Sequence, residues 1–173
     1  MHSEKLKAGG VFTITCYDKE GNLKWEDKTP NLVVNVGLQD MNDKYFSGSS
    51  YSATWYLGVY GAAASNDPAA ADTMSSHAGW TEVTDYDEST RPQCNFGSAT
   101  AADPSVISNS ASVAVFTING TTTIGGAFLT SDNTKGGTSG ILFSAADFQA
   151  PGDRSVISGD VINLTYQFSL NAA

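Results

Sequence analysis

The sequence predicts an all-β protein, namely a single-domain β-sandwich or jelly-roll-like barrel of about eight or nine strands with one short helix. Charged residues make up only 16% of the 173 residues, and 17 residues are glycine. This composition suits short strands joined by turns. No alternation of strands and helices appears, which argues against a parallel sheet. The apolar segments of the second half are separated by turn signals at Asn119-Gly120, Asp132-Asn133 and Gly159-Asp160.

The clearest hairpin lies near the start of the chain, where two strand-like stretches flank residues 19–22. Gly21 and Asn22 supply the positive φ that a tight turn needs. The last segment, DVINLTYQFSL, alternates apolar and polar residues with the period of a strand that has one buried face. We expect it to be paired on both edges. Its predicted buried residues are Ile162, Leu164, Tyr166, Phe168 and Leu170.

One stretch between these strands has helical spacing. Leu38, Met41 and Tyr45 recur at i, i+3 and i+7, which predicts a short helix with an apolar face. Asn35 is placed to cap its first turn.

An aromatic and β-branched run at residues 53–60 predicts a strand, and the small residues and Pro68 that follow it predict an exposed loop that offers a contact surface. A chain of this length buries about two-thirds of its unfolded surface in one core. We therefore expect one domain, residues 10–173, preceded by an N-terminal arm of residues 1–9.

The net charge limits the partners. Nine Lys and Arg against 18 Asp and Glu give a charge of −9, and such a surface repels phosphates and anionic lipid. We expect neither nucleic acid nor membrane as a partner, because no stretch approaches the roughly 18 apolar residues of a membrane span. The N-terminus also lacks the apolar region of a signal peptide, so we expect the chain to fold in the cytoplasm.

The two cysteines have no metal-binding or redox spacing. Cys16 shares a strand face with Phe12 and Ile14, which predicts a small buried apolar residue. A disulfide between Cys16 and Cys94 would require maturation outside the cell, since cytosolic thiols stay reduced.

The stretch SHAGWTEVTDYDESTRP, residues 76–92, concentrates groups that could carry chemistry. His77 has serines beside it and Asp85 downstream, but no nucleophile elbow, zinc-protease motif or phosphate-binding glycine loop accompanies them. We therefore expect no enzyme and no cofactor. Two histidines are too few to favour a zinc site. Calcium remains open, because Asp85, Asp87 and Glu88 carry hard oxygen ligands in a loop without the glycine of an EF-hand.

Paired carboxylates for glycoside hydrolysis could come from the same acids, and aromatic rings could stack on sugars. The simpler interpretation is structural: Trp55 and Trp80 anchor a core or an interface. His77 and Arg91 then bond to loop carbonyls or carboxylates, and the segment fixes the shape of a loop. The residues singled out as structural or interface candidates are Trp55, Tyr56, His77, Trp80, Tyr86 and Arg91.

Five stretches together resemble a group of small structural proteins encoded by tailed bacteriophages. They are NLVVNVGLQDM, TWYLGVYG, DTMSSHAGWTEVTDYDESTRP, SVAVFTINGTTTIGGAFLTSDNTKGGTSGILFSAADF and SGDVINLTYQFSL. The resemblance covers nearly the whole chain and extends to the order of the hairpin, the helix start and the final strand.

The resemblance implies a virion component without catalytic residues, assembled in the host cytoplasm. Its partners would be the major capsid protein or other virion subunits, and we expect a homo-oligomer on the particle. A capsid decoration or cement protein is the preferred role, because the chain lacks coiled-coil heptads and fibrous repeats. A tail or head/tail-fibre component is the alternative within this class, and a carbohydrate-binding or glycan-hydrolysing β-domain is the alternative outside it.

Overall fold

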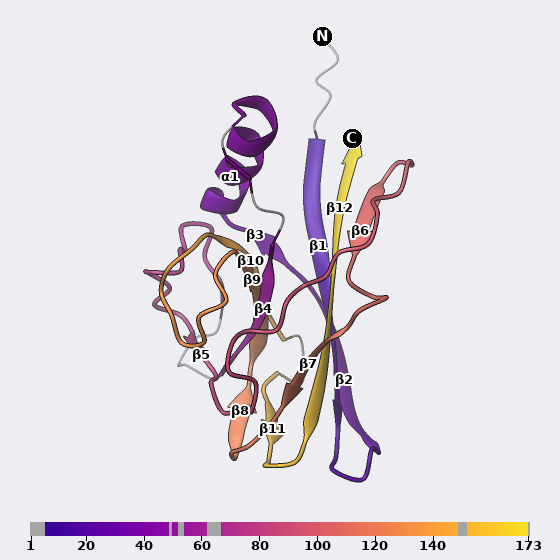
Figure 1. The fold of residues 1–173 in the computed structure, drawn as a ribbon, viewed down its shortest axis with the longest axis vertical. Helices are drawn as coiled ribbons and strands as arrows, with labels where there is room; N and C mark the ends of the chain where they lie inside the picture. Colours follow the sequence, from indigo (N-terminus) through magenta and orange to yellow (C-terminus); the bar gives the residue numbers. More distant parts are fainter. Residues whose placement is uncertain (1–5, 49, 52–53, 62–66, 149–151, 173) are drawn as a thin grey trace.

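The computed structural model describes residues 6–48, 50–51, 54–61, 67–148 and 152–172. Twelve strands and one helix make up this part of the chain (Figure 1). Four of the strands have only two or three residues, which leaves eight longer strands. The expected all-β architecture is confirmed. Antiparallel sheets stack as an open sandwich and do not close into a barrel.

The first sheet is built around the last strand. Strand β12 pairs with β1 along its whole length on one edge, and with β6 and then β7 on the other. The prediction that this strand is paired on both edges is therefore confirmed. The bounds of the five strands are Leu6–Tyr17 for β1, Leu23–Pro30 for β2, Ser105–Ser108 for β6, Ala114–Thr117 for β7 and Val161–Ala172 for β12.

The predicted hairpin joins β1 and β2, and Gly21 has the expected positive φ of 85°. Asp18 holds this turn by accepting hydrogen bonds from the backbone N–H groups of Glu20 and Asn22. The turn residues therefore fix the register of the first sheet.

The second sheet has the strand order β3-β10-β9-β4-β5. The segment expected as one strand around residues 121–131 divides into β8 and β9, which belong to different sheets, because β8 pairs with β11 in a separate ribbon. The bounds are Leu32–Val33 for β3, Tyr56–Gly61 for β4, Thr81–Glu82 for β5, Gly126–Thr130 for β9 and Leu142–Asp147 for β10, with Thr122–Ile124 for β8 and Arg154–Val156 for β11.

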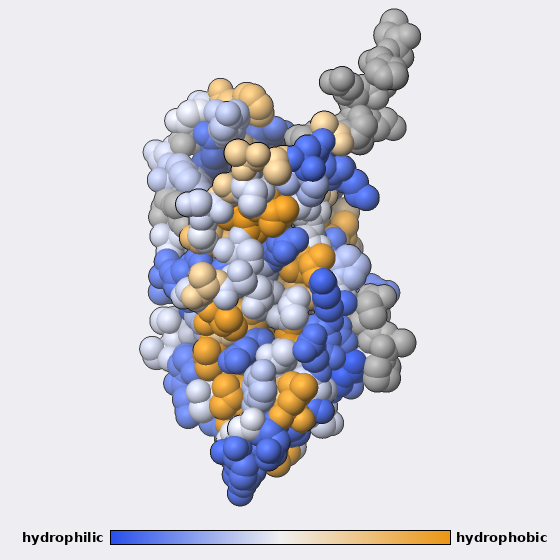
Figure 2. Space-filling view, turned by 90° about the vertical axis from the view of Figure 1, so that its right-hand side faces the viewer, coloured by the Kyte–Doolittle hydropathy of each residue, from blue (hydrophilic) through white to orange (hydrophobic). Residues whose placement is uncertain are grey.

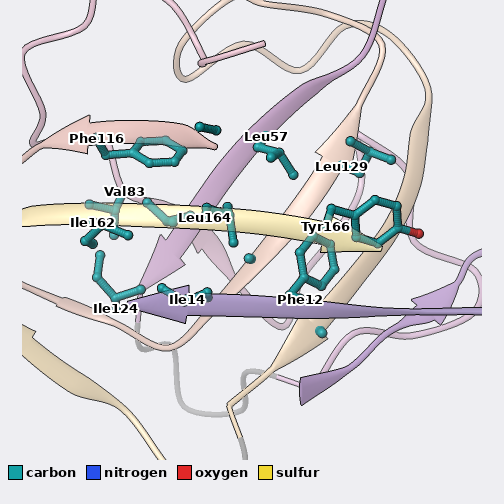
Figure 3. Close-up of a cluster of buried hydrophobic side chains, with 14 of the residues drawn as sticks. Phe12, Ile14, Leu57, Val83, Phe116, Ile124, Leu129, Ile162, Leu164 and Tyr166 are labelled. Atoms are coloured by element: carbon teal, nitrogen blue, oxygen red, sulfur yellow. The ribbon is translucent and has the colours of Figure 1, made fainter. Parts of the chain in front are cut away.

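The main core lies between the two sheets. Figure 3 shows side chains of β1 and β12 pointing toward those of β4 and β9. Of the five predicted inward residues, Ile162, Leu164 and Tyr166 are fully buried, whereas Phe168 and Leu170 are only half-buried. Cys16 lies in the same core and Cys94 at its edge, and both are free thiols. Burial raises the pKa of Cys16 to about 11 and that of Cys94 to about 12, so both stay protonated near neutral pH.

The second sheet is buried on both faces, which explains why β4, β9 and β10 read as continuous apolar runs without alternation. A second cluster covers its outer face and includes Tyr60, Trp80 and Phe128. Gly58 is required here, because a Cβ at this position would lie 2.1 Å from the ring of Phe128. The outer cluster therefore depends on this close approach.

Three boundaries and contacts differ from the predictions. Residues 6–9, expected in the arm, belong to β1 and pair with β12; residues 1–5 lie outside the described part. Helix α1, Asn35–Phe46, follows an N-cap at Val34 without a side-chain hydrogen bond, so Asn35 is not its cap. The expected apolar face is buried only in part: Met41 is half-buried and packs against the main core, whereas Leu38 and Tyr45 are exposed. The buried positions of the helix are Gly37 and Asp40. Gly37 packs against the backbone of β10, which only a residue without a side chain allows.

The loop after β4 was expected to be exposed, and most of its described residues between 67 and 76 are exposed. Residues 62–66 lie outside the described part. Farther along, Asp72 and Met74 are buried, and Met74 packs in the outer cluster. This part of the loop therefore covers the outer face of the second sheet.

Candidate functional site

The segment of residues 76–92 covers the outer face of the second sheet. Trp80 is 2% exposed, and its ring packs on Tyr60 and Phe128 at centroid distances of 5.0 and 5.1 Å. Its indole N–H donates to Asp72 Oδ2 at 3.1 Å. The prediction of a buried, locally bonded Trp80 is confirmed. The role of Asp72 was not predicted, because nothing in a loop of small residues indicates a buried carboxylate.

His77 stacks on Trp80, with ring centroids 3.8 Å apart and planes 17° apart. Its Nδ1 donates to the carbonyl oxygen of Trp80 at 2.9 Å, which fixes the proton of the neutral ring on Nδ1. The nearby hydroxyls of Thr73 and Ser75 bond to each other. His77 is thus a turn residue bonded to a carbonyl, as the structural interpretation predicted.

Arg91 is a fully buried cation at the end of the segment. Its Nε and one terminal nitrogen donate to both oxygens of Glu82 at 2.9 and 2.7 Å, a bidentate pair. Its remaining donors reach the carbonyl oxygens of Asp132 and Gly137. Its guanidinium also lies 5.3 Å from the ring centroid of Phe128. Arg91 therefore ties the segment to the loop after β9.

Tyr86 leaves the outer face and enters the main core, where it meets Phe116 edge-on at 5.1 Å. Burial raises the pKa of its hydroxyl above the ordinary value for tyrosine. Lys135 lies over its ring and donates to its carbonyl oxygen. Tyr86 is therefore an anchor between the two sheets.

Two of the acids near Tyr86, Asp87 and Glu88, bond to other groups of the chain. Asp87 is exposed and accepts a hydrogen bond from Asn119. Glu88 is half-buried and accepts hydrogen bonds from both the backbone N–H and the hydroxyl of Thr117. In the described ranges, no three His, Cys, Asp or Glu side chains gather closely enough to hold a metal ion.

Trp55 and Tyr56 lie elsewhere, at the start of β4. Trp55 is 9% exposed and meets Phe143 edge-on at 5.4 Å. Tyr56 is half-buried and forms an isolated bridge with Gln93. The six singled-out residues therefore do not form one site. Trp80 lies in the outer cluster, and His77 and Arg91 pack against it. Trp55 and Tyr86 lie in the main core, and Tyr56 follows Trp55 as the first residue of β4.

Trp55 borders an apolar groove of about 810 Å³ at one end of the sandwich. The groove lies between α1 and the end of β12, near the point where β1 begins (Figure 1). We call this feature the end groove. Its apolar lining comes from Trp55, Phe96, Ile107, Phe143, Phe168 and Leu170. A concave apolar pocket of this size is the usual form of a binding site.

The rim of the end groove carries Tyr45 and Phe46 from α1, followed by Tyr51. Tyr45 was predicted to lie on the apolar face of a helix, and Phe46 and Tyr51 were not singled out from the sequence. Adjacent aromatics at the last turn of a helix, both unable to face one core, were the available signal. On the side that carries β6 and β2, apolar residues are interspersed with polar ones along the whole length of the molecule (Figure 2).

The fold defines the chain as an all-β, sandwich-like domain. Comparisons with protein-family models, with curated proteins and with solved structures found no match to this chain. The described residues contain one helix, which has 12 residues and is too short and too polar to cross a bilayer.

Proposed function

We propose that this protein is a non-enzymatic structural protein of a tailed-bacteriophage particle, and that it serves as a decoration or cement protein on the head lattice. Its partners are the major capsid protein or other virion subunits, and several copies associate on the particle. It assembles in the host cytoplasm and resides in the virion. A tail or head/tail-fibre position is the alternative within the same class.

One observation supports a binding role over a chemical one. Four groups of residues 76–92 that could do chemistry are used inside the chain: His77 bonds to a carbonyl, Arg91 neutralises Glu82, and Glu88 holds Thr117. An acid or base that is bonded in this way is not presented to a substrate. The open apolar surface lies instead at the end groove.

The class of protein comes from the resemblance between the five sequence stretches and small phage structural proteins. The buried outer cluster gives a physical reason for the stretch that contains residues 76–92, because Trp80 and Arg91 hold these residues against the outer face of the second sheet. A segment held in this way gives the protein a surface of fixed shape, which suits a protein that binds to neighbouring subunits.

Quantitative mass spectrometry of particles purified away from host lysate tests the proposal. We expect many copies of the chain per particle, enriched in the head fraction after heads and tails are separated. Enrichment in the tail fraction would favour the tail alternative, and absence from the particles would reject the virion role. A glycan array and a reducing-sugar assay on the isolated chain test the carbohydrate alternative, and we expect both to be blank.

A further inference from the structure

The rim of the end groove exposes large aromatic side chains. Tyr45, Phe46 and Tyr51 are 83%, 79% and 61% exposed. They border a groove whose apolar walls include Phe143 and Phe168. Aromatic residues next to a concave apolar surface are typical of the centre of a protein–protein interface.

The rim is held in place before any partner binds. The rings of Tyr45 and Phe46 meet edge-on, 4.8 Å apart at 81°. Lys44 donates to the carbonyl oxygen of Ser50, which fastens the end of α1 to the segment that follows it. A preorganised rim loses little conformational entropy on association.

The charge of the end groove favours a second copy of this chain as its occupant. Among the described residues that line it, the charged ones are Asp40 and Lys44, one acid and one base with their charged atoms 3.9 Å apart. The groove is therefore neutral on a chain of net charge −9. Two copies of such an acidic chain repel each other, and a neutral apolar patch is the surface on which this repulsion is weakest.

The protruding and the receiving parts of the surface belong to the same end of the molecule. A two-fold contact requires a surface that complements itself, with a projection and a hollow side by side. The Tyr45–Phe46 pair supplies the projection and the end groove supplies the hollow.

We infer that two copies of this chain associate through the end groove, with the Tyr45–Phe46 pair of each copy seated in the groove of the other. The inference rests on the proposed function, since it names the surface through which neighbouring copies on the particle meet. Association of the purified chain is measured without particles, so its failure and the failure of the virion role are distinguishable.

Sedimentation velocity on the purified chain, from micromolar to near-millimolar concentration, tests the inference. We expect a reversible monomer–dimer equilibrium. Phe46→Ser should raise the dissociation constant at least about 10-fold, the usual effect of truncating a central aromatic anchor. Added sodium chloride should strengthen the dimer, because salt screens the repulsion between two acidic chains.

Leu23→Ser and Ile157→Ser are the matched controls. These residues are 57% and 53% exposed, close to the 61% of Tyr51, but neither lines the end groove. Both controls should leave the dissociation constant unchanged, and thermal unfolding should show that all three variants are folded. A chain that stays monomeric at every concentration, or a dimer that Phe46→Ser weakens no more than the controls do, would overturn the inference.

Discussion

Asn109 takes the place of a neighbouring strand for Tyr166. Along β12, pairing passes from β7 to β6, and neither strand reaches Tyr166. The side chain of Asn109 fills this gap: its Oδ1 accepts from the Tyr166 N–H at 2.7 Å, and its Nδ2 donates to the carbonyl oxygen of Leu164 at 3.3 Å. The Asn109 N–H donates to the Tyr166 carbonyl oxygen. Asn109 is fully buried, so no water can replace it without rearrangement.

Replacement of Asn109 should therefore destabilise the first sheet. Asn109→Ala leaves the Tyr166 N–H and the Leu164 carbonyl without their side-chain partner, and we expect the free energy of unfolding to fall by about 1–3 kcal/mol. Urea denaturation measures the change. Asn95→Ala is the control, because Asn95 is exposed and makes one long side-chain bond; it should cost no more than about 0.5 kcal/mol. Equal effects of the two changes would argue against this role for Asn109.

The buried ion pair of Arg91 and Glu82 should be costly to break. Arg91→Ala leaves the buried carboxylate of Glu82 without its bidentate partner, so we expect a loss of about 3–5 kcal/mol. The exposed pair of Lys19 and Glu20, with side chains 74% and 60% exposed, is the control. Lys19→Ala should change the free energy of unfolding by no more than about 0.5 kcal/mol. A loss for Arg91→Ala as small as that of the control would show that the pair does not hold residues 76–92 on the second sheet.

Trp80 offers a separation of packing from hydrogen bonding. Trp80→Ala should cost about 3–5 kcal/mol, the usual effect of deleting a large buried aromatic. Trp80→Phe keeps much of the contact with Tyr60 and Phe128 but removes the indole N–H that Asp72 accepts. Its cost should be smaller, about 1–3 kcal/mol, because the buried Asp72 Oδ2 loses one of its two donors and keeps the N–H of Ala69. If Phe were as harmful as Ala, the hydrogen bond to Asp72 would matter more than the packing.

The pattern of the sequence was sufficient for the class of fold and for the final strand, because period-2 alternation from Ile162 to Tyr166 depends only on one buried face. It was insufficient for α1. The positions that face the sheet are Gly37 and Asp40, and neither residue type signals burial. Apolar residues of the helix instead form the rim of a groove, which the helical spacing alone does not distinguish from a core-facing stripe.

The partners of the singled-out residues show the same limit. The general expectation that His77 and Arg91 bond to carbonyls or carboxylates followed from their chemistry. The sequence did not indicate which ones, because Gly137 and Asp132 lie more than 40 positions from Arg91 and meet it only through the fold. Neighbouring acids likewise look equivalent in the sequence, yet the carboxylate of Glu88 accepts from the backbone of β7 and that of Asp87 accepts from the side chain of Asn119.

Asp87 and Glu88 should therefore respond differently to replacement. Glu88→Ala removes the acceptor for the N–H and hydroxyl of Thr117, and we expect a loss of about 1–2 kcal/mol. Asp87→Asn should change stability by no more than about 0.5 kcal/mol. Added calcium should leave the Tm of the wild-type chain unchanged, because these acids are already bound to protein groups. A calcium-dependent rise in Tm that disappears in Asp87→Asn would instead establish a metal site.

The pH dependence of stability should carry the signature of Asp147, at the end of β10. Burial, followed by the nearby charges of Asp67 and Asp153, raises the pKa of Asp147 from 3.8 to about 6. The folded chain then holds the proton more tightly than the unfolded chain does. The contribution of this group to stability is largest below the unfolded pKa and is lost as the pH rises through about 6.

Asp147→Asn mimics the protonated side chain. The variant should therefore be more stable than wild type at about pH 7 and almost equally stable at about pH 4. Asp18 is the control of opposite sign, because its hydrogen bonds with Asn22 lower its pKa. Asp18→Asn should lower stability near neutral pH and lose this effect as the pH falls through the pKa of Asp18. Urea unfolding across this pH range, with the three proteins in parallel, measures both differences. If Asp147→Asn stabilised the chain equally at both ends of the range, its effect would not come from ionisation.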